Sequence, residues 1–445
     1  MERVAKIALI GGGSVQWTLK LATDMALNAT LAGADLVLHD IDADALDLLT
    51  RASQRVVELA RGTLRVTQTL DRVAALRDAD FVILCVGIGM LKAMRNDLEI
   101  PERYGIYQSV GDTVGPGGLA RALRHIPFAV QVAREMEQVC PRAWLLNLTN
   151  PMTTICRGVT RVTKIRTIGL CHEVTHALPR LTALLGIASK QITFDVAGIN
   201  HLPIVLRFNV GKQDGISLLR DWLTQHRPTE TVAPPTINAA ADVFKDQLAL
   251  KLFLLDQFGT LFGAGDRHVA EFFPGFLTDA TQRGLAYGVL LTRIEHREDI
   301  FRERRARIER FIAGGIWELE PTEEQLTSVM AALAGGPTGR FIVNVPNRGQ
   351  IDNLARDAVV ECMARVDALG VHPETTGALS HTAHAIIAPH VARQELIVEA
   401  ALTGSKKSAL AALATDPLVR DPATPAPMLN ELIAANVPYT QQKYE

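Results

Sequence analysis

A cysteine, a histidine and a glutamate are adjacent at Cys171, His172 and Glu173, and a second histidine, His201, follows 30 residues after the cysteine. A thiolate and an imidazole can bind a metal ion, and a site with two protein ligands leaves coordination positions open for substrate oxygens. Cys171 and His201 are therefore predicted metal ligands. Because zinc signatures have more ligands at closer spacing, a strand end without a metal is the alternative. His172 and Glu173 add groups that can donate or accept a proton.

A glycine-rich segment, residues 11–14, follows a short apolar run near the N-terminus. Glycines at such a turn let the backbone approach a pyrophosphate at the start of a helix. Gly11, Gly13 and Ser14 are therefore predicted to bind a dinucleotide. Asp40 ends the next apolar segment, where a carboxylate accepts hydrogen bonds from ribose hydroxyls and repels a 2′-phosphate, which favours NAD over NADP. A tight turn without a ligand is the alternative.

Two asparagines and a glycine-flanked loop supply further polar groups. Asn147 and Asn150 follow an apolar segment, where their amides can bind ribose or sugar hydroxyls or can cap the loop itself. Asp266 and Arg267 lie in the loop 263–268, which can carry a base and a cation for an anionic ligand. A helix start with Asp266 as its N-cap is the alternative interpretation.

Other charged residues are weaker candidates for a site. Arg95 and Arg283 are candidates for substrate binding, although by sequence alone an ordinary surface arginine is the better interpretation of each. The segment 295–309 is dense in both charge signs. This pattern is typical of a solvated helix face with pairs at i,i+4 rather than of a basic binding patch.

The composition limits the classes of protein to which the chain can belong. The chain has 445 residues, of which 48% are hydrophobic, enough for two domains with sizeable cores. A net charge of −2 gives no electrostatic basis for binding nucleic acid or an anionic membrane. The apolar runs are shorter than the ~20 residues of a membrane span. Five scattered cysteines and a start without a leader pattern predict a cytoplasmic protein without a disulfide framework.

Short apolar runs alternate with helical patterns through the first 190 residues. This alternation is typical of buried parallel strands and predicts a doubly wound α/β sheet. Two adjacent extended segments then suit a hairpin. We predict an NAD-binding Rossmann-like domain over 1–190 and an α+β domain for substrate, metal and oligomerisation over 191–445. The predicted strands are 4–10, 35–40, 80–87, 143–148 and 166–170, and the hairpin segments are 192–199 and 202–210.

Seven motifs, taken in order, resemble glycoside hydrolase family 4, the NAD- and manganese-dependent glycosidases. The resemblance extends over essentially the whole chain. It implies a lactate/malate-dehydrogenase-like architecture, NAD and Mn²⁺ as cofactors, a small-molecule sugar substrate, and a cytoplasmic homo-dimer or homo-tetramer. The motifs are Gly11-Gly12-Gly13-Ser14, Gly115-Pro116-Gly117-Gly118-Leu119 with Arg121-Ala122-Leu123-Arg124, Thr149-Asn150-Pro151, Cys171-His172, Asn200-His201, Asn344-Val345-Pro346-Asn347-Arg348-Gly349 and Glu399-Ala400-Ala401-Leu402-Thr403-Gly404.

The resemblance also implies a substrate class. The motif Cys171-His172-Glu173-Val174 resembles the α-galacturonidase version of the family's metal motif. The expected substrates are therefore α-D-galacturonides, and an uncharged α-glucoside or α-galactoside is the nearest alternative.

Residue roles follow from the same resemblance. His172 occupies the proton-donor position, with Glu173 adjacent to it. Asp266 stands where several members use a tyrosine as the base, and Tyr287 is the alternative candidate. Cys171 and His201 are the implied metal ligands. The implied substrate-binding residues are Arg95, Asn150, Arg267 and Arg283, with Arg267 expected to bind the uronate carboxylate.

The implied reaction is redox-neutral overall. NAD oxidises C3 of the sugar, a base removes the C2 proton, the C1 aglycone leaves, water adds, and the hydride returns. A plain NAD-dependent 2-hydroxy-acid dehydrogenase shares the first half of the architecture but consumes NAD stoichiometrically. A non-catalytic NAD-sensing protein, the third hypothesis, releases no sugar.

Overall fold

The computed structural model describes residues 4–187, 192–228, 240–322, 324–440 and 442–445. Its N-terminal half contains six parallel strands in the order β3-β2-β1-β4-β5-β6, which confirms the predicted doubly wound sheet. The strand β3 was not predicted, since only Val66 is buried in it. The strands are β1 (Lys6–Ile10), β2 (Asp35–His39), β3 (Arg65–Thr69), β4 (Phe81–Leu84), β5 (Trp144–Asn147) and β6 (Arg166–Gly169).

Helices cover both faces of this parallel sheet, which is why its central strands are mostly apolar. In β1, Ile7 and Leu9 belong to the core on one face, with residues of α1 and α2, whereas Ala8 and Ile10 belong to the core on the other, with residues of α5 and α6. The division follows from the alternation of side chains along a strand. The helices are α1 (Thr18–Leu27), α2 (Ala43–Leu59), α3 (Arg72–Leu76), α4 (Met90–Arg103), α5 (Gly115–Val139) and α6 (Met152–Val162).

Antiparallel strands extend the sheet beyond β6. The strands β7 and β8 pair on either side of Asn200 and His201, as expected for a hairpin. The pairing of Gly169 with Asn344 joins β6 to β10, so the 12 strands of the described residues form one sheet. The added strands are β7 (Ile192–Ile199), β8 (Leu202–Val210), β9 (Gln213–Asp214), β10 (Gly339–Pro346), β11 (Val359–Asp367) and β12 (Gly370–Pro373).

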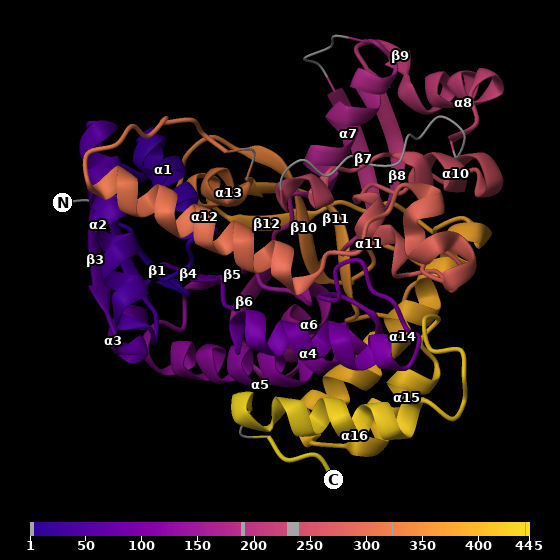
Figure 1. The fold of residues 1–445 in the computed structure, drawn as a ribbon. Coiled ribbons are helices and arrows are strands. Elements are labelled where there is room, and N and C mark those ends of the chain that lie inside the picture. Colours follow the sequence, from indigo (N-terminus) through magenta and orange to yellow (C-terminus); the bar gives the residue numbers. More distant parts are fainter. Residues whose placement is uncertain (1–3, 188–191, 229–239, 323, 441) are drawn as a thin grey trace.

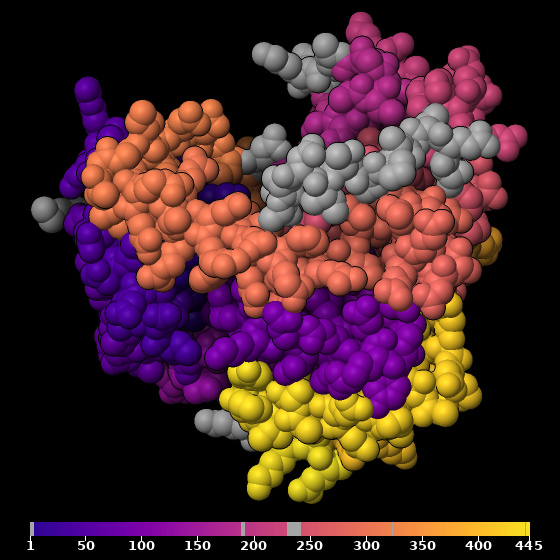
Figure 2. Space-filling model, viewed as in Figure 1, coloured from indigo at the N-terminus to yellow at the C-terminus, as the bar shows by residue number. Residues whose placement is uncertain are grey.

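The later helices connect the two halves of the chain. Helix α14 packs against α5 and α6, and α12 crosses the front of the molecule from α2 toward the 3-10 turn η2 (Ala240–Phe244) (Figures 1 and 2). The elements are α7 (Glu173–Leu184), α8 (Gly215–Gln225), α10 (Ala249–Phe258), α11 (Asp266–Ala270), η3 (Asp279–Tyr287), α12 (Ile294–Ile312), α13 (Leu326–Leu333), α14 (His381–Thr403), α15 (Lys406–Ala414) and α16 (Pro425–Asn436).

The predicted domain boundary between residues 190 and 191 lies outside the described residues. On either side of it, the parallel and antiparallel strands share one sheet. In the part of the chain that the structure describes, no helix is both long enough and apolar enough to cross a membrane.

Candidate functional site

Three side chains from separate segments converge in the interior of the molecule. Asp112 comes from the loop between α4 and α5, His201 from the turn between β7 and β8, and His268 from α11. Each offers one ligand atom, and these atoms lie within 4.8 Å of one another. The rings of His201 and His268 are 3.7 Å apart between centroids. His201 was predicted as a metal ligand, whereas Asp112 and His268 were not.

Hydrogen bonds orient this group of three. The Thr113 hydroxyl donates to Asp112 Oδ1 at 2.6 Å and lies 2.7 Å from His201 Nδ1, so it accepts from that nitrogen and leaves Nε2 with a free lone pair. Asn150 Nδ2 donates to Asp112 Oδ2 at 3.3 Å, which places Asn150 at the site. The group is thus held in a form that can bind a cation.

The protonation states of the three side chains also favour the binding of a cation. Burial lowers the pKa of His201 to about 3, and burial lowers the pKa of His268 as well, so both imidazoles are neutral at pH 7. Burial opposes ionisation of Asp112, but His268, His201 and Arg121 outweigh it and hold the pKa of this carboxyl below its ordinary value. Neutral imidazoles and an ionised carboxylate are the forms that bind metal ions.

Glu173 and His172 lie beside the group of three. Glu173 Oε2 accepts from the backbone N–H of Gly265 at 2.9 Å, and its Oε1 is 3.7 Å from His268 Nε2 and 3.8 Å from His172 Nε2. His172 Nδ1 is 3.1 Å from Glu324 Oε1. Burial lowers the pKa of His172, but the hydrogen bond to Glu324 and the charges of Glu324 and Glu173 raise it by more. His172 therefore holds a proton more firmly than an ordinary histidine.

Cys171 lies next to a different set of polar groups. Its thiol hydrogen-bonds Asn200, and burial together with the charges of Glu361 and Glu173 raises its pKa well above the ordinary value. Asn200 and Asn344 also donate to Glu361 Oε1, at 3.4 and 3.0 Å. Among the described residues, the group of possible ligands contains His201 but not Cys171.

Asp266, the predicted base, is buried behind the site. Its carboxylate accepts from the backbone N–H groups of Leu250 and Lys251 at 2.9 and 3.1 Å, and the Lys251 ammonium is 3.2 Å away. It therefore caps α10, whose N-cap residue Leu248 offers no side-chain acceptor. Burial and the charge of Asp246 raise the pKa of Asp266 to about 7.

The predicted substrate arginines have different surroundings. Arg95 is paired with Glu99, Glu295 and Glu298 at the surface. Arg283 is paired with Asp279 and Glu102, and its guanidinium lies over the ring of Tyr107. Arg267 is half-buried beside His268, and its Nη2 donates to Ser109 O and Thr292 Oγ1. Of these three arginines, the structure brings only Arg267 next to the group.

The glycine turn follows β1, a central strand of the parallel sheet. Gly11 has φ +98°, and a Cβ there would lie 2.0 Å from the carbonyl oxygen of Cys85, so only glycine fits. The N–H of Gly13 donates to Asp40 Oδ2 at 2.9 Å, and Ser14 Oγ accepts from a backbone N–H of the same turn at 3.3 Å. Asp40 thus lies against the predicted pyrophosphate turn.

Asn147 has a clear structural role at the end of β5. Its amide donates to Thr149 O at 2.9 Å and accepts from Thr149 N at 3.1 Å, which fixes the loop that carries Asn150. Its predicted contact with a cofactor stays a prediction.

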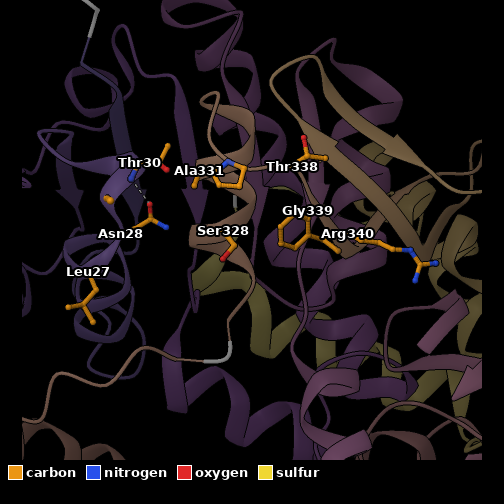
Figure 3. A pocket seen from close by; sticks show the side chains of 11 residues that line it. Leu27, Asn28, Thr30, Ser328, Ala331, Thr338, Gly339 and Arg340 are labelled. Carbon is orange, nitrogen blue, oxygen red and sulfur yellow. Dashed lines mark hydrogen bonds between the residues drawn. The ribbon is translucent and has the colours of Figure 1, made fainter. Parts of the chain in front are cut away.

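A surface pocket lies elsewhere in the molecule (Figure 3). It contains none of the predicted site residues. Its lining residues are Leu27, Asn28, Ala29, Thr30, Ser328, Ala331, Pro337, Thr338, Gly339, Arg340 and Phe341.

Comparisons with known proteins cover nearly the whole chain. An α-galacturonidase of Thermoanaerobacterium saccharolyticum is 34% identical over 429 residues, which is 93% of this chain and 91% of that protein. An α-galacturonidase of Bacillus subtilis is 34% identical over 429 residues, 93% of each.

Solved structures show the same fold. The crystal structure of lplD from Bacillus subtilis has a TM-score of 0.88 at 32% identity and covers 96% of this chain and 99% of that one. A 6-phospho-α-glucosidase from gut microorganisms, in complex with NAD and Mn²⁺, has a TM-score of 0.83 at 21% identity and covers 100% of both chains. The malate dehydrogenase of Plasmodium falciparum, at 12% identity, has a TM-score of 0.51 and covers 89% of this chain and 98% of that one, in keeping with the predicted architecture.

Family models match both halves of the sequence. The model of the family 4 glycosyl hydrolases matches residues 6–187, and the model of their C-terminal domain matches residues 196–419. These matches confirm the family resemblance and the glycosidase class. The protein belongs to family 4 of the glycosyl hydrolases.

Proposed function

We propose that this protein is an α-galacturonidase that uses NAD and Mn²⁺. The observation that carries the proposal is the 34% identity to α-galacturonidases over 93% of the chain. The group of Asp112, His201 and His268, with Glu173 and His172 beside it, supports the metal-dependent chemistry.

The residues around the glycine turn fit a dinucleotide. The turn follows a central parallel strand and precedes α1, and Gly11 lies too close to Cys85 for any side chain. Asp40 follows the neighbouring strand β2, where it can accept hydrogen bonds from ribose hydroxyls. Gly11, Gly13, Ser14 and Asp40 would therefore hold NAD.

The residues of the second site fit Mn²⁺. A carboxylate suits this hard cation, and two neutral imidazoles complete a three-ligand set. Asp112, His201 and His268 would hold the ion, and Cys171 remains the ligand that the family resemblance implies. A thiol would have to lose its proton on binding, against the raised pKa of Cys171.

With both groups bound, NAD supplies transient oxidation at sugar C3, and the cation supplies charge stabilisation for removal of the C2 proton. His172 then acts as the acid toward the leaving oxygen, because Glu324 keeps it protonated. Asp266 acts as the base, and a pKa of about 7 suits that task at neutral pH. Asn150 is placed to orient a sugar hydroxyl, because it already contacts Asp112.

A substrate panel tests the proposal. Digalacturonate and p-nitrophenyl α-glycosides of galactose and glucose would be incubated with NAD and Mn²⁺ supplied or withheld. We expect release of galacturonate that requires both cofactors and leaves no net NADH. Activity only on the neutral glycosides would favour the other family substrate, and one NADH formed per sugar would favour a dehydrogenase. A homo-dimer or homo-tetramer remains our prediction, which sedimentation of the holoenzyme checks.

A further inference from the structure

Helix α12 looks like a solvated helix with paired charges, but one of its arginines points inward. Arg305 pairs with Glu309 and Arg302 pairs with Asp299 at the surface, as the charge pattern predicts. Arg297 instead buries Nε and Nη2, and neither nitrogen has a hydrogen-bond partner among the described residues. Buried polar nitrogens without a partner cost folding free energy, so a ligand that pairs with them is expected.

Arg297 faces the candidate active site. Its guanidinium lies 5.8 Å from the ring centroid of Phe244, and the guanidinium of Arg267 lies 4.7 Å from the same centroid. Arg267 directly precedes His268, a member of the group of three. Asp112, another member, and Glu271 are among the charged groups that act on Arg297. The two arginines therefore border the space next to the proposed metal site.

Other buried polar atoms around this space also lack partners in the described part of the chain. They belong to Asn150, Arg267, His268 and Glu271, at Oδ1, Nε, Nδ1 and Oε2 respectively. The region therefore favours an anionic, hydrogen-bonding ligand.

We propose that Arg297 binds the C6 carboxylate of the galacturonide, an inference that rests on the proposed function. Its two unpartnered nitrogens, Nε and Nη2, form the edge of the guanidinium that bonds both oxygens of a carboxylate. Other arginines of the described structure use that same edge, including Arg340 toward Glu374. Arg72 donates from Nε and Nη2 to the two oxygens of Glu135, and Arg157 does so to Glu395.

The other candidate arginines are less available for a substrate. Arg95 and Arg283 are each paired with acidic side chains. Arg267 already donates from Nη2 to two acceptors, so its Nε–Nη2 edge is not free for both oxygens of a carboxylate. Arg297 is thus the arginine of this set with a free two-nitrogen edge in the described structure.

Binding and turnover together test the inference. Calorimetry on the holoenzyme with NAD and Mn²⁺ would compare D-galacturonate, D-galactose and D-galactose 6-phosphate in the wild type and in Arg297→Gln. We expect the variant to lose galacturonate affinity by about 10²-fold and galactose affinity by less than about 3-fold, with kcat/KM for digalacturonate falling in parallel. Arg297→Lys, which keeps the charge but not the two-nitrogen edge, should recover only part of the loss. The matched control is Arg305→Gln, an exposed arginine of the same helix, which should change neither affinity.

The outcomes separate this inference from the proposed function. If the wild type binds galacturonate through Arg297 but hydrolyses no galacturonide, the inference stands and the proposed function fails. Equal losses for galacturonate and galactose in Arg297→Gln, or galacturonate binding that does not depend on Arg297, would overturn the inference. Wild-type preference for the 6-phosphate over the carboxylate would overturn it too. Thermal unfolding checks the fold: removal of buried nitrogens without a partner should not lower the unfolding temperature.

Discussion

At the scale of single residues, the site depends on side chains whose polar atoms are buried yet incompletely paired. His201 uses one nitrogen for Thr113 and keeps the other free, and His268 Nδ1 has no partner in the described structure. Such atoms cost folding free energy unless a ligand satisfies them. Their concentration around Asp112 supports our proposal that this place, rather than the surface pocket, is the functional centre.

The metal ligands are tested by substitution. Asp112→Asn and His268→Gln should each weaken Mn²⁺ binding by on the order of 10²-fold or more, because even outer-shell partners of a metal contribute 10- to 100-fold. Titration of the protein with Mn²⁺, followed by electron paramagnetic resonance, measures this. His372→Gln is the control, since His372 pairs with Asp367 outside the group. If both variants bind Mn²⁺ with wild-type affinity and Cys171→Ser binds it more weakly, then Cys171 is the metal ligand instead.

The role of Asp266 gives a second residue-scale prediction. Asp266→Asn should slow exchange of the C2 proton by on the order of 10²–10⁴-fold, because an amide cannot act as the base. In the wild type, kcat should rise with pH through about 7 as the carboxyl ionises. Solvent deuterium incorporation at C2 measures the exchange. If Asp266→Asn exchanges the C2 proton at the wild-type rate but unfolds at a lower temperature, Asp266 is not the base and serves only to cap α10.

At the scale of elements, the site is formed by helix ends and turns whose positions are set by contacts that lie outside the site. The loop that carries Asp112 lies between α4 and α5, and these two helices are joined by a buried ion pair. Arg124 Nη1 and Nη2 donate to the two carboxylate oxygens of Asp97 at 2.9 and 2.5 Å, and both side chains are almost fully buried. The pair therefore positions the site without touching it.

Breaking this ion pair should destabilise the protein strongly. Asp97→Ala leaves Arg124 charged and buried, which should lower the free energy of unfolding by about 3–5 kcal/mol. The control, Arg103→Ala in the same helix, removes an exposed pair with Glu431 and should cost under about 1 kcal/mol. Urea unfolding of the two variants gives the comparison, and similar values for both would contradict the prediction.

At the scale of the whole molecule, one sheet joins the dinucleotide turn to the hairpin that carries His201. Several acidic side chains are buried in the fold that this sheet organises. Burial raises the pKa of Glu271 to about 8, of Glu361 to about 7 and of Asp266 to about 7. The folded protein therefore binds protons that the unfolded chain releases at the ordinary pKa values of 4.5 for glutamate and 3.8 for aspartate.

The proton on Glu271 predicts a pH dependence of stability. Its carboxyl has a folded pKa of about 8 against an ordinary value of 4.5, so the folded state holds one more proton between these values. The free energy of unfolding should therefore fall with rising pH, by about 1.4 kcal/mol per pH unit from this group. Glu271→Gln keeps the acceptor for Val110 and Gly111 but cannot titrate. Urea unfolding from about pH 5.5 to about pH 7.5 should show a shallower fall in the variant, and identical slopes would refute the assignment.

The sequence by itself determined the features that depend on neighbouring residues. Short apolar runs specified the parallel strands, because burial on both faces leaves no polar positions, and Gly11 marked the turn, because no side chain fits there. The expected hairpin around His201 and the family membership were also readable from local motifs. The strand β3 was not, since its mostly exposed residues carry no apolar signal.

Only the tertiary structure decided which distant side chains meet. Thr113 and His201 are 88 residues apart, and their contact depends on the packing of a loop against a hairpin. The same holds for Arg95 and Arg297, which look alike in a charged sequence. Arg95 finds three carboxylates at the surface, whereas Arg297 is turned inward without a partner in the described structure. Partner choice among charged side chains follows from their three-dimensional surroundings, for which residue type and spacing give no signal.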